Sequence, residues 1–496
     1  MLFNSLAFAI FLPIVFLLYW ASPQKYRWVV LLIASYYFYM SWNVKYVVLI
    51  LFTTFVSYLA SILIPKFQQK STKIITMLTA VCASLLVLFF FKYFNFTMET
   101  LARVCQKIAI PMQPMTLKLM LPVGISFYTF QTLSYVIDVY KGEVEPERNF
   151  FKYAAFISFF PQLVAGPIER TRNLLPQIDG EHRFTYEKGS YGLKLMAWGF
   201  FKKLVIADNM AVLADEVFET PEEFRGLSLL LAILFFTIQI YCDFSGYSDI
   251  AIGTAKLFDI DLMTNFKSPY FSSSIQEFWR RWHISLSSWF RDYVYIPLGG
   301  SRVSKVRHYF NLCFTFLLSG LWHGAAFTYI VWGGLHGVLQ CVENLIFPKK
   351  KRTVKSKEEI VAANQAEQKK LSESRDIVWW IRVCVVFLCA AMCWCFFRAN
   401  SCSQALYILR HMVDGVTSPV AYIKTGLAVF NKGVLVEMIL PLVLLGVYDF
   451  VALDQDPIKI VSGLKKPARY AIYYAFVLMV LLLASFNSQE FVYFQF

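Results

Sequence analysis

Charged residues are scarce in this 496-residue chain. They make up 16% of it, whereas soluble domains carry about 25%. Hydrophobic residues account for 57% and aromatic residues for 18%, and the mean hydropathy is +0.51. This balance excludes an ordinary soluble domain and indicates a polytopic membrane protein, in which aromatic residues serve packing and the interfacial belts.

Signatures of several other protein classes are also missing. The ten cysteines are scattered and show no zinc-like pairing with histidines, so we predict neither a metal site nor a disulfide framework. A Gly-x-Ser-x-Gly elbow is absent, which disfavours a serine hydrolase. The net charge is +14, but no basic soluble domain is present to bind nucleic acid. Lys and Arg instead concentrate in short loops, as the positive-inside rule requires of a membrane protein.

Apolar segments of spanning or near-spanning length recur along the whole chain. The first lacks a basic leading region and a cleavage site, so we expect a retained span and no signal peptide. The segment 151–165 suits a half-span or re-entrant helix, because it contains Pro161 and is followed by Gly166-Pro167. The expected helices cover residues 2–20, 28–41, 44–64, 74–96, 117–140, 151–165, 191–214, 227–253, 309–328, 328–347, 377–398, 433–453 and 468–486.

The stretch between the expected helices 328–347 and 377–398 is polar and free of aromatic residues. Residues 349–375 contain nine basic and four acidic residues. We therefore predict that residues 348–376 form a polar cytoplasmic loop. The chain shows no internal repeat.

Histidine is rare, and the chain has only six. One of them, His323, lies in Trp322-His323-Gly324, within an apolar stretch (residues 309–347) whose only acidic or basic residue is Glu343. An ionisable side chain in a membrane span is costly unless it has a partner or lines a wet cavity. If the helix begins near residue 309, His323 lies roughly 21 Å deep in a ~30 Å core. We expect it to sit in a funnel or tunnel and to act as a general base, because imidazole accepts a proton from a hydroxyl at neutral pH.

The alternative for His323 is a core histidine that is hydrogen-bonded to a helix carbonyl. For His336, on the next apolar segment, this structural interpretation is preferred. Gly320 and Gly324 flank His323 and would let a backbone or a ligand approach closely.

A second group of residues, 277–300, interleaves aromatic residues with arginines and ends in Gly299-Gly300. Such a segment is typical of the membrane interface. Arg280 and Arg281 either anchor it there or attract an anionic, phosphate-carrying donor to a cytoplasmic vestibule. His283 lies beside these arginines, which favours its neutral, hydrogen-bonding form. Composition leaves both interpretations open.

A third group, residues 241–249, places two carboxylates, two serines and two tyrosines beside an apolar run. Asp243 and Ser245 either line a polar path or belong to a structural hydrogen-bond network. A nucleophilic serine is the least favoured interpretation.

At these residues the chain resembles the membrane-bound O-acyltransferase family, in the bacterial polysaccharide branch that includes the alginate O-acetyltransferase membrane subunit. The membrane protein of teichoic-acid D-alanylation is a more distant member of the branch. The resemblance covers essentially the whole chain, and the combined motifs are specific although each alone would be weak. The matching stretches are residues 121–128 (LPVGISFY), 161–168 (PQLVAGPI), 243–249, 265–300, 319–337 and 491–496.

The resemblance implies an all-α polytopic fold formed by residues 1–496 as a single domain. About eleven transmembrane helices, with re-entrant or interfacial helices, would surround a central funnel. His323 would be the active-site residue, with His283 as its partner. Residues that would line the substrate path are Asp243, Ser245, Trp322, Arg280 and Arg281.

The implied function is transfer of an acetyl group from a cytoplasmic donor across the membrane, for O-acetylation of an exported polysaccharide. The implied donor is acetyl-CoA, with no bound cofactor and no metal. An exported esterase-like acyltransferase of the SGNH type would complete the transfer, and the bacterial cytoplasmic membrane and its lipids would surround the chain. The alternatives are D-alanyl transfer to teichoic acid, a transporter without acyl chemistry, and a scaffold of a secretion complex. The missing repeat and the few acidic residues within spans disfavour the transporter.

Overall fold

The computed structural model describes residues 1–348, 375–485 and 491–492, and every regular element among them is helical. The prediction of an all-α polytopic membrane protein is confirmed. The predicted polar loop at 348–376 lies almost wholly outside the described residues. The described chain forms two compact units, and the predicted single domain stays a prediction.

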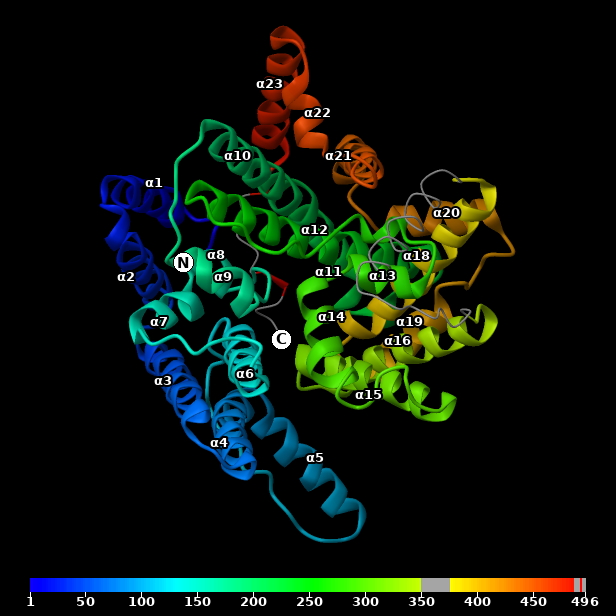
Figure 1. The fold of residues 1–496 in the computed structure, drawn as a ribbon. Coiled ribbons are helices and arrows are strands. Elements are labelled where there is room, and N and C mark those ends of the chain that lie inside the picture. Colours follow the sequence, from blue (N-terminus) through cyan, green and yellow to red (C-terminus); the bar gives the residue numbers. More distant parts are fainter. Residues whose placement is uncertain (349–374, 486–490, 493–496) are drawn as a thin grey trace. The chain divides into compact units, whose positions relative to one another are not determined.

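The first unit comprises Met1–Phe200, Phe244–Thr264 and, at the end of the chain, Phe491 and Val492. Helix α6 is its most buried long helix, and α3 and α4 both pack against α6 (Figure 1). The helices are α1 (Leu6–Ala21), α2 (Arg27–Met40), α3 (Val47–Leu63), α4 (Lys70–Leu88), α5 (Phe94–Lys107), α6 (Ile125–Lys141), α7 (Phe150–Ser158), α8 (Phe160–Leu163), α9 (Thr171–Ile178), α10 (Tyr186–Phe200) and the last part of α12 (Leu227–Leu257).

The second unit comprises Phe201–Asp243 and the described residues from Asn265 to Ser485. A π-helical segment, Phe201–Ala207, opens it. Its helices are α11 (Asp208–Phe218), the first part of α12, α13 (Ile275–Arg281), α14 (Ile284–Phe290), α15 (Lys305–His323), α16 (Phe327–Ile346), α18 (Ile377–Arg398), α19 (Cys402–His411), α20 (Pro419–Ala428), α21 (Lys432–Val451), α22 (Pro457–Gly463) and α23 (Lys466–Leu483).

Six of the described helical runs are long and apolar enough to cross a membrane, which establishes a multi-pass protein. They are Val44–Lys66, Lys70–Lys107, Leu227–Leu257, Ile377–Arg398, Lys432–Val451 and Lys466–Leu483. Helix α1 is apolar but shorter. The total of about eleven spans and the central funnel stay predictions.

The helix expected over residues 117–140 starts later than predicted. Gly124 adopts a left-handed φ of +75°, and α6 begins directly after it, at Ile125. A Cβ at Gly124 would collide with the carbonyl oxygen of Leu163, so only glycine fits there. In place of one helix over 151–165 the structure has two short helices, α7 and α8, and a half-span or re-entrant position in the membrane stays a prediction.

Within the first unit, α10 and the end of α12 approach each other at two glycine contacts. A Cβ at Gly192 would lie 2.6 Å from the carbonyl oxygen of Gly253, and one at Gly199 would lie 2.6 Å from that of Gly246. In each helix the two glycines are seven residues apart, so they share one face. Small residues on one face let membrane helices pack backbone to backbone.

Candidate active site

The α15–α16 hairpin of the second unit carries His323 at its break, since His323 is the last residue of α15. A Cβ at Gly320 would collide with the carbonyl oxygen of Tyr329, and one at Gly333 with that of Phe316. These two glycines therefore bring the helices into backbone contact. At Gly324, the Tyr329 ring occupies the space that a side chain would need. The close approach predicted around His323 is thus made by α16.

The His323 ring lies among aromatic rings. Its centroid is 5.0 Å from that of Trp322, 5.0 Å from that of Trp332 and 5.3 Å from that of Phe397. The residue is 3% exposed. Aromatic walls of this kind exclude water from the surroundings of the imidazole.

His283 lies near His323, with ring centroids 6.4 Å apart, and it is fully buried. It adopts a left-handed φ of +43° at the start of α14. Asn265 fixes the turn, because its backbone carbonyl accepts from Ile284 N at 2.9 Å and its Oδ1 accepts from Ser285 N at 3.3 Å. The structure thus brings together the two histidines that the sequence singled out, while their catalytic roles stay predictions.

His336 has a different environment from His323. The indole Nε1 of Trp279 donates a hydrogen bond to His336 Nδ1 at 3.3 Å, so this ring nitrogen carries a lone pair. The ring of Phe278 stacks on the imidazole with an interplanar angle of 3°. His336 is fully buried, and these contacts support the structural role preferred from the sequence.

The two predicted arginines have different surroundings. Arg281 forms an ion pair with Glu277 at 2.8 Å and donates to the carbonyl of Lys267 at 3.2 Å, so it stabilises the fold around α13. Arg280 is exposed at the end of the same helix. Of the pair, Arg280 is therefore the one available to an anionic ligand.

Asp243 belongs to a buried group of three charged residues. Lys203 Nζ lies 2.6 Å from Asp243 Oδ1 and 2.9 Å from Asp208 Oδ1. Such contacts support the structural network interpretation of Asp243, and its role in lining a substrate path stays a prediction. Ser245 is also buried and lies in the first unit. The Trp322 ring lies near both histidine rings, and its centroid is 6.1 Å from that of His283.

Sequence reasoning missed Lys203 and Asp208, and it also missed Asp449, which accepts from Tyr241 Oη at 2.7 Å. The signal for the first two was present. Lys203 and Asp208 lie within the apolar segment 191–214, where an ionisable residue requires a partner. The π-helical segment that contains Lys203 was not predictable from spacing.

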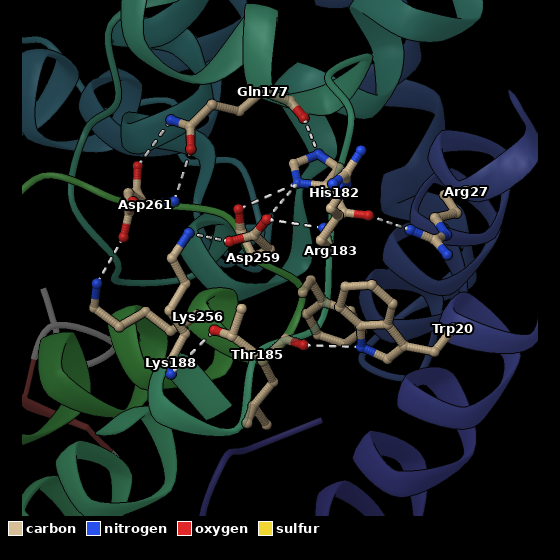
Figure 2. Close-up of polar contacts among 12 residues, drawn as sticks. Trp20, Arg27, Gln177, His182, Arg183, Thr185, Lys188, Lys256, Asp259 and Asp261 are labelled. Carbon is tan, nitrogen blue, oxygen red and sulfur yellow. Dashed lines mark hydrogen bonds and ion pairs between the residues drawn. The ribbon is translucent and has the colours of Figure 1, made fainter. Parts of the chain in front are cut away.

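A polar cluster in the first unit, shown in Figure 2, fastens the loop that follows α12. His182 Nε2 lies 2.5 Å from the carbonyl of Gln177, and its Nδ1 lies 3.2 Å from that of Asp259. Partial burial alone would raise the pKa of Asp259, but the ion pair with Lys188 and the N–H of Arg183 outweigh it and hold that pKa below its usual value. Gln177 and Asp261 exchange two hydrogen bonds, of 2.8 and 3.0 Å. Sequence reasoning did not single out this cluster.

Comparison with known proteins gives consistent similarities. Residues 146–364 match the model of the membrane-bound O-acyltransferase family. The chain is 44% identical to the probable alginate O-acetylase AlgI of Pseudomonas aeruginosa over 350 residues, which is 70% of this chain and 66% of the relative. It is 35% identical to the peptidoglycan O-acetyltransferase of Helicobacter pylori over 445 residues, 83% of this chain and 80% of that protein. Similarity to the teichoic acid D-alanyltransferase of Bacillus subtilis is lower, at 31% over 45% of this chain and 58% of the relative.

Proposed function

Because the chain belongs to the membrane-bound O-acyltransferase family, we propose that it passes an acetyl group across the membrane for O-acetylation of an extracellular or periplasmic polysaccharide. The chain is a multi-pass membrane protein and an O-acyltransferase by family. Two relatives that share more than a third of their aligned residues with it are named for O-acetylation, one of alginate and one of peptidoglycan. D-alanyl transfer is the alternative, supported by a more distant relative over a shorter alignment.

The observation that carries the proposal is the proximity of His323 and His283 among aromatic rings of the second unit. In the proposed reaction an acceptor hydroxyl attacks the carbonyl carbon of a thioester, so a C–O bond forms and the C–S bond breaks. His323 takes the hydroxyl proton and returns it to the departing thiolate. The oxygen of an acceptor hydroxyl can form one hydrogen bond of about 2.8 Å to each of the two rings, so His283 can orient the acceptor.

We propose acetyl-CoA as the cytoplasmic donor. The exposed Arg280 supports this choice, because a guanidinium binds phosphate groups in two-point contacts. A thioester donor also suits a buried imidazole base, because a site that excludes water protects the thioester from hydrolysis. The bacterial cytoplasmic membrane is the proposed location, since it separates such a donor from an exported polymer.

An exported esterase-like acyltransferase of the SGNH type is the proposed partner for the final transfer to the sugar. The names of the alginate relatives support a role in an alginate acetylation system. Family membership favours acyl chemistry over a transporter or a scaffold.

The proposal is tested with the purified full-length chain and acetyl-CoA labelled in the acetyl group. Wild-type protein should release free CoA and, once the partner acyltransferase is added, form labelled product with an acceptor oligosaccharide. The His323→Gln variant should lose both activities, while His411→Gln, at a half-buried histidine of α19, should keep them. Equal product formation by wild type and His323→Gln would overturn the proposal. Product from a D-alanyl carrier protein and none from acetyl-CoA would favour the teichoic-acid alternative.

A further inference from the structure

Two cysteine sulfurs meet on the α15–α16 hairpin. The Sγ atoms of Cys313 and Cys341 lie 3.7 Å apart, which is van der Waals contact between two thiols. Both residues are free cysteines of intermediate exposure. They belong to different helices, so a bond between them would join α15 to α16 covalently.

The glycines of the hairpin explain why these sulfurs are so close. Helix axes usually lie about 8–10 Å apart, whereas disulfides join Cα atoms about 4.4–6.8 Å apart. Here the backbone contact at Gly320 and Gly333 continues to Gly337, where a Cβ would lie 3.0 Å from the Cα of Cys313. Cys341 is one turn further along α16 and therefore on the same face as Gly337. The hairpin thus holds the two thiols near the separation that a disulfide needs.

We propose that Cys313 and Cys341 form an oxidation site, at which hydrogen peroxide produces a reversible disulfide between α15 and α16. Cys341 Sγ also lies 3.9 Å from the carbonyl oxygen of Tyr309, to which its S–H can donate. This contact retains the proton on Cys341, so Cys313 reacts first.

The reaction proceeds in two balanced steps. The sulfur of Cys313 attacks one oxygen of hydrogen peroxide, the O–O bond breaks, and sulfenic acid and one water form. The sulfur of Cys341 then attacks the sulfenic sulfur, the S–S bond forms, and a second water departs. Each cysteine is oxidised by one electron, and peroxide is reduced by two. A dithiol reductant such as dithiothreitol reverses the reaction by thiol–disulfide exchange.

The expected consequence rests on the proposed function. His323 ends α15 and is only 3% exposed, so entry of a substrate would require movement of the surrounding elements. A covalent bond between the two helices of the hairpin opposes such movement. Oxidation should therefore slow acetyl transfer several-fold, and reduction should restore it.

The experiment uses full-length protein in detergent, treated with hydrogen peroxide, alkylated, digested and analysed by mass spectrometry. We expect a linked pair of peptides containing Cys313 and Cys341, which disappears after dithiothreitol treatment. The variants Cys313→Ser and Cys341→Ser should lose both the linkage and the sensitivity of acetyl transfer to peroxide. Cys384→Ser, which removes an exposed thiol on α18, is the matched control and should keep both.

Absence of the linked peptides from oxidised, folded protein would overturn the oxidation site. Linkage without any change in transfer rate would overturn its effect on activity. If the reduced chain transfers no acetyl group at all, the proposed function fails, but the peptide measurement still tests the disulfide.

Discussion

The imidazole rings of His283 and His323 lie with their centroids 6.4 Å apart, at an interplanar angle of 60°. One ring begins α14 and the other ends α15, so each is held at a helix terminus. In the proposed reaction the pair would serve as a preorganised site for an acceptor hydroxyl.

His283 is expected to contribute to the proposed acetyl transfer through its imidazole ring and not through its backbone conformation. Its left-handed φ favours Asn or Gly over other residues, so His283→Asn should fold with nearly wild-type thermal stability. It should nevertheless lose about 10²- to 10⁴-fold in kcat, the usual contribution of acid–base and orienting groups. His283→Ala adds backbone strain and should also lower Tm. Wild-type kcat in the Asn variant would contradict a role in the reaction.

The aromatic wall of His323 is expected to limit the size of the acyl group. The Phe397 ring lies 5.3 Å from the imidazole, centroid to centroid. Phe397→Ala removes this ring, so kcat/KM for propionyl-CoA and butyryl-CoA should rise relative to kcat/KM for acetyl-CoA. Phe396→Ala, at the adjacent buried residue, controls for the loss of a ring from α18. An unchanged acyl preference in Phe397→Ala would contradict the proposed wall.

The buried Lys203 is expected to stabilise the fold by forming ion pairs with two carboxylates. Lys203→Met leaves Asp208 and Asp243 buried without their cation, which typically costs about 3–5 kcal/mol. The triple variant Lys203→Met, Asp208→Asn, Asp243→Asn lacks all three charged side chains, so its Tm should be close to that of the wild type and well above that of Lys203→Met. Lys424→Met, at an exposed position, should leave Tm unchanged. If the triple variant has a wild-type Tm but transfers no acetyl group, the network also serves the reaction.

Glu169 is expected to make the stability of the chain depend on pH. Burial raises its pKa to about 7, from an ordinary value of 4.5. The folded state then binds a proton that the unfolded state has lost between these pH values, so the free energy of unfolding falls as pH rises through this window. The decrease is on the order of 3 kcal/mol, at 1.36 kcal/mol per pKa unit.

Thermal unfolding in detergent from pH 4.5 to 7 measures this effect. Glu169→Gln cannot ionise, so its Tm should fall less over the same window than the Tm of the wild type. Glu187→Gln, at an exposed position, should follow the wild-type curve. Parallel curves for wild type and Glu169→Gln would contradict the shifted pKa.

The sequence was informative where the type of a single residue did not suit the segment that contains it. His323 stood out as an imidazole in an apolar segment, although the boundary predicted at residue 328 lies at residues 324–326, between α15 and α16. Pro161 and the Gly166-Pro167 pair indicated an interrupted segment over 151–165, but not that it would consist of two helices, α7 and α8. The membrane class followed from composition alone.

Contacts between distant segments were not predictable in the same way. Asn265 fixes the turn of His283 through tertiary hydrogen bonds that no local pattern encodes. The partner of Asp243 is Lys203 on a preceding segment, and the partner of His336 is Trp279. The close contact of Cys313 and Cys341 required the helix crossing set by the glycines. In each case the sequence supplied the residue type and the fold chose its neighbour.

The most direct measurement is the O-acetyl content of the polysaccharide from cells that produce the His323→Gln variant as their sole copy. Wild-type and variant protein must be present in the membrane in equal amounts. We expect acetylation by the variant to fall to the level of cells that lack the protein. Acetylation near the wild-type level would contradict the assignment of His323 as the general base.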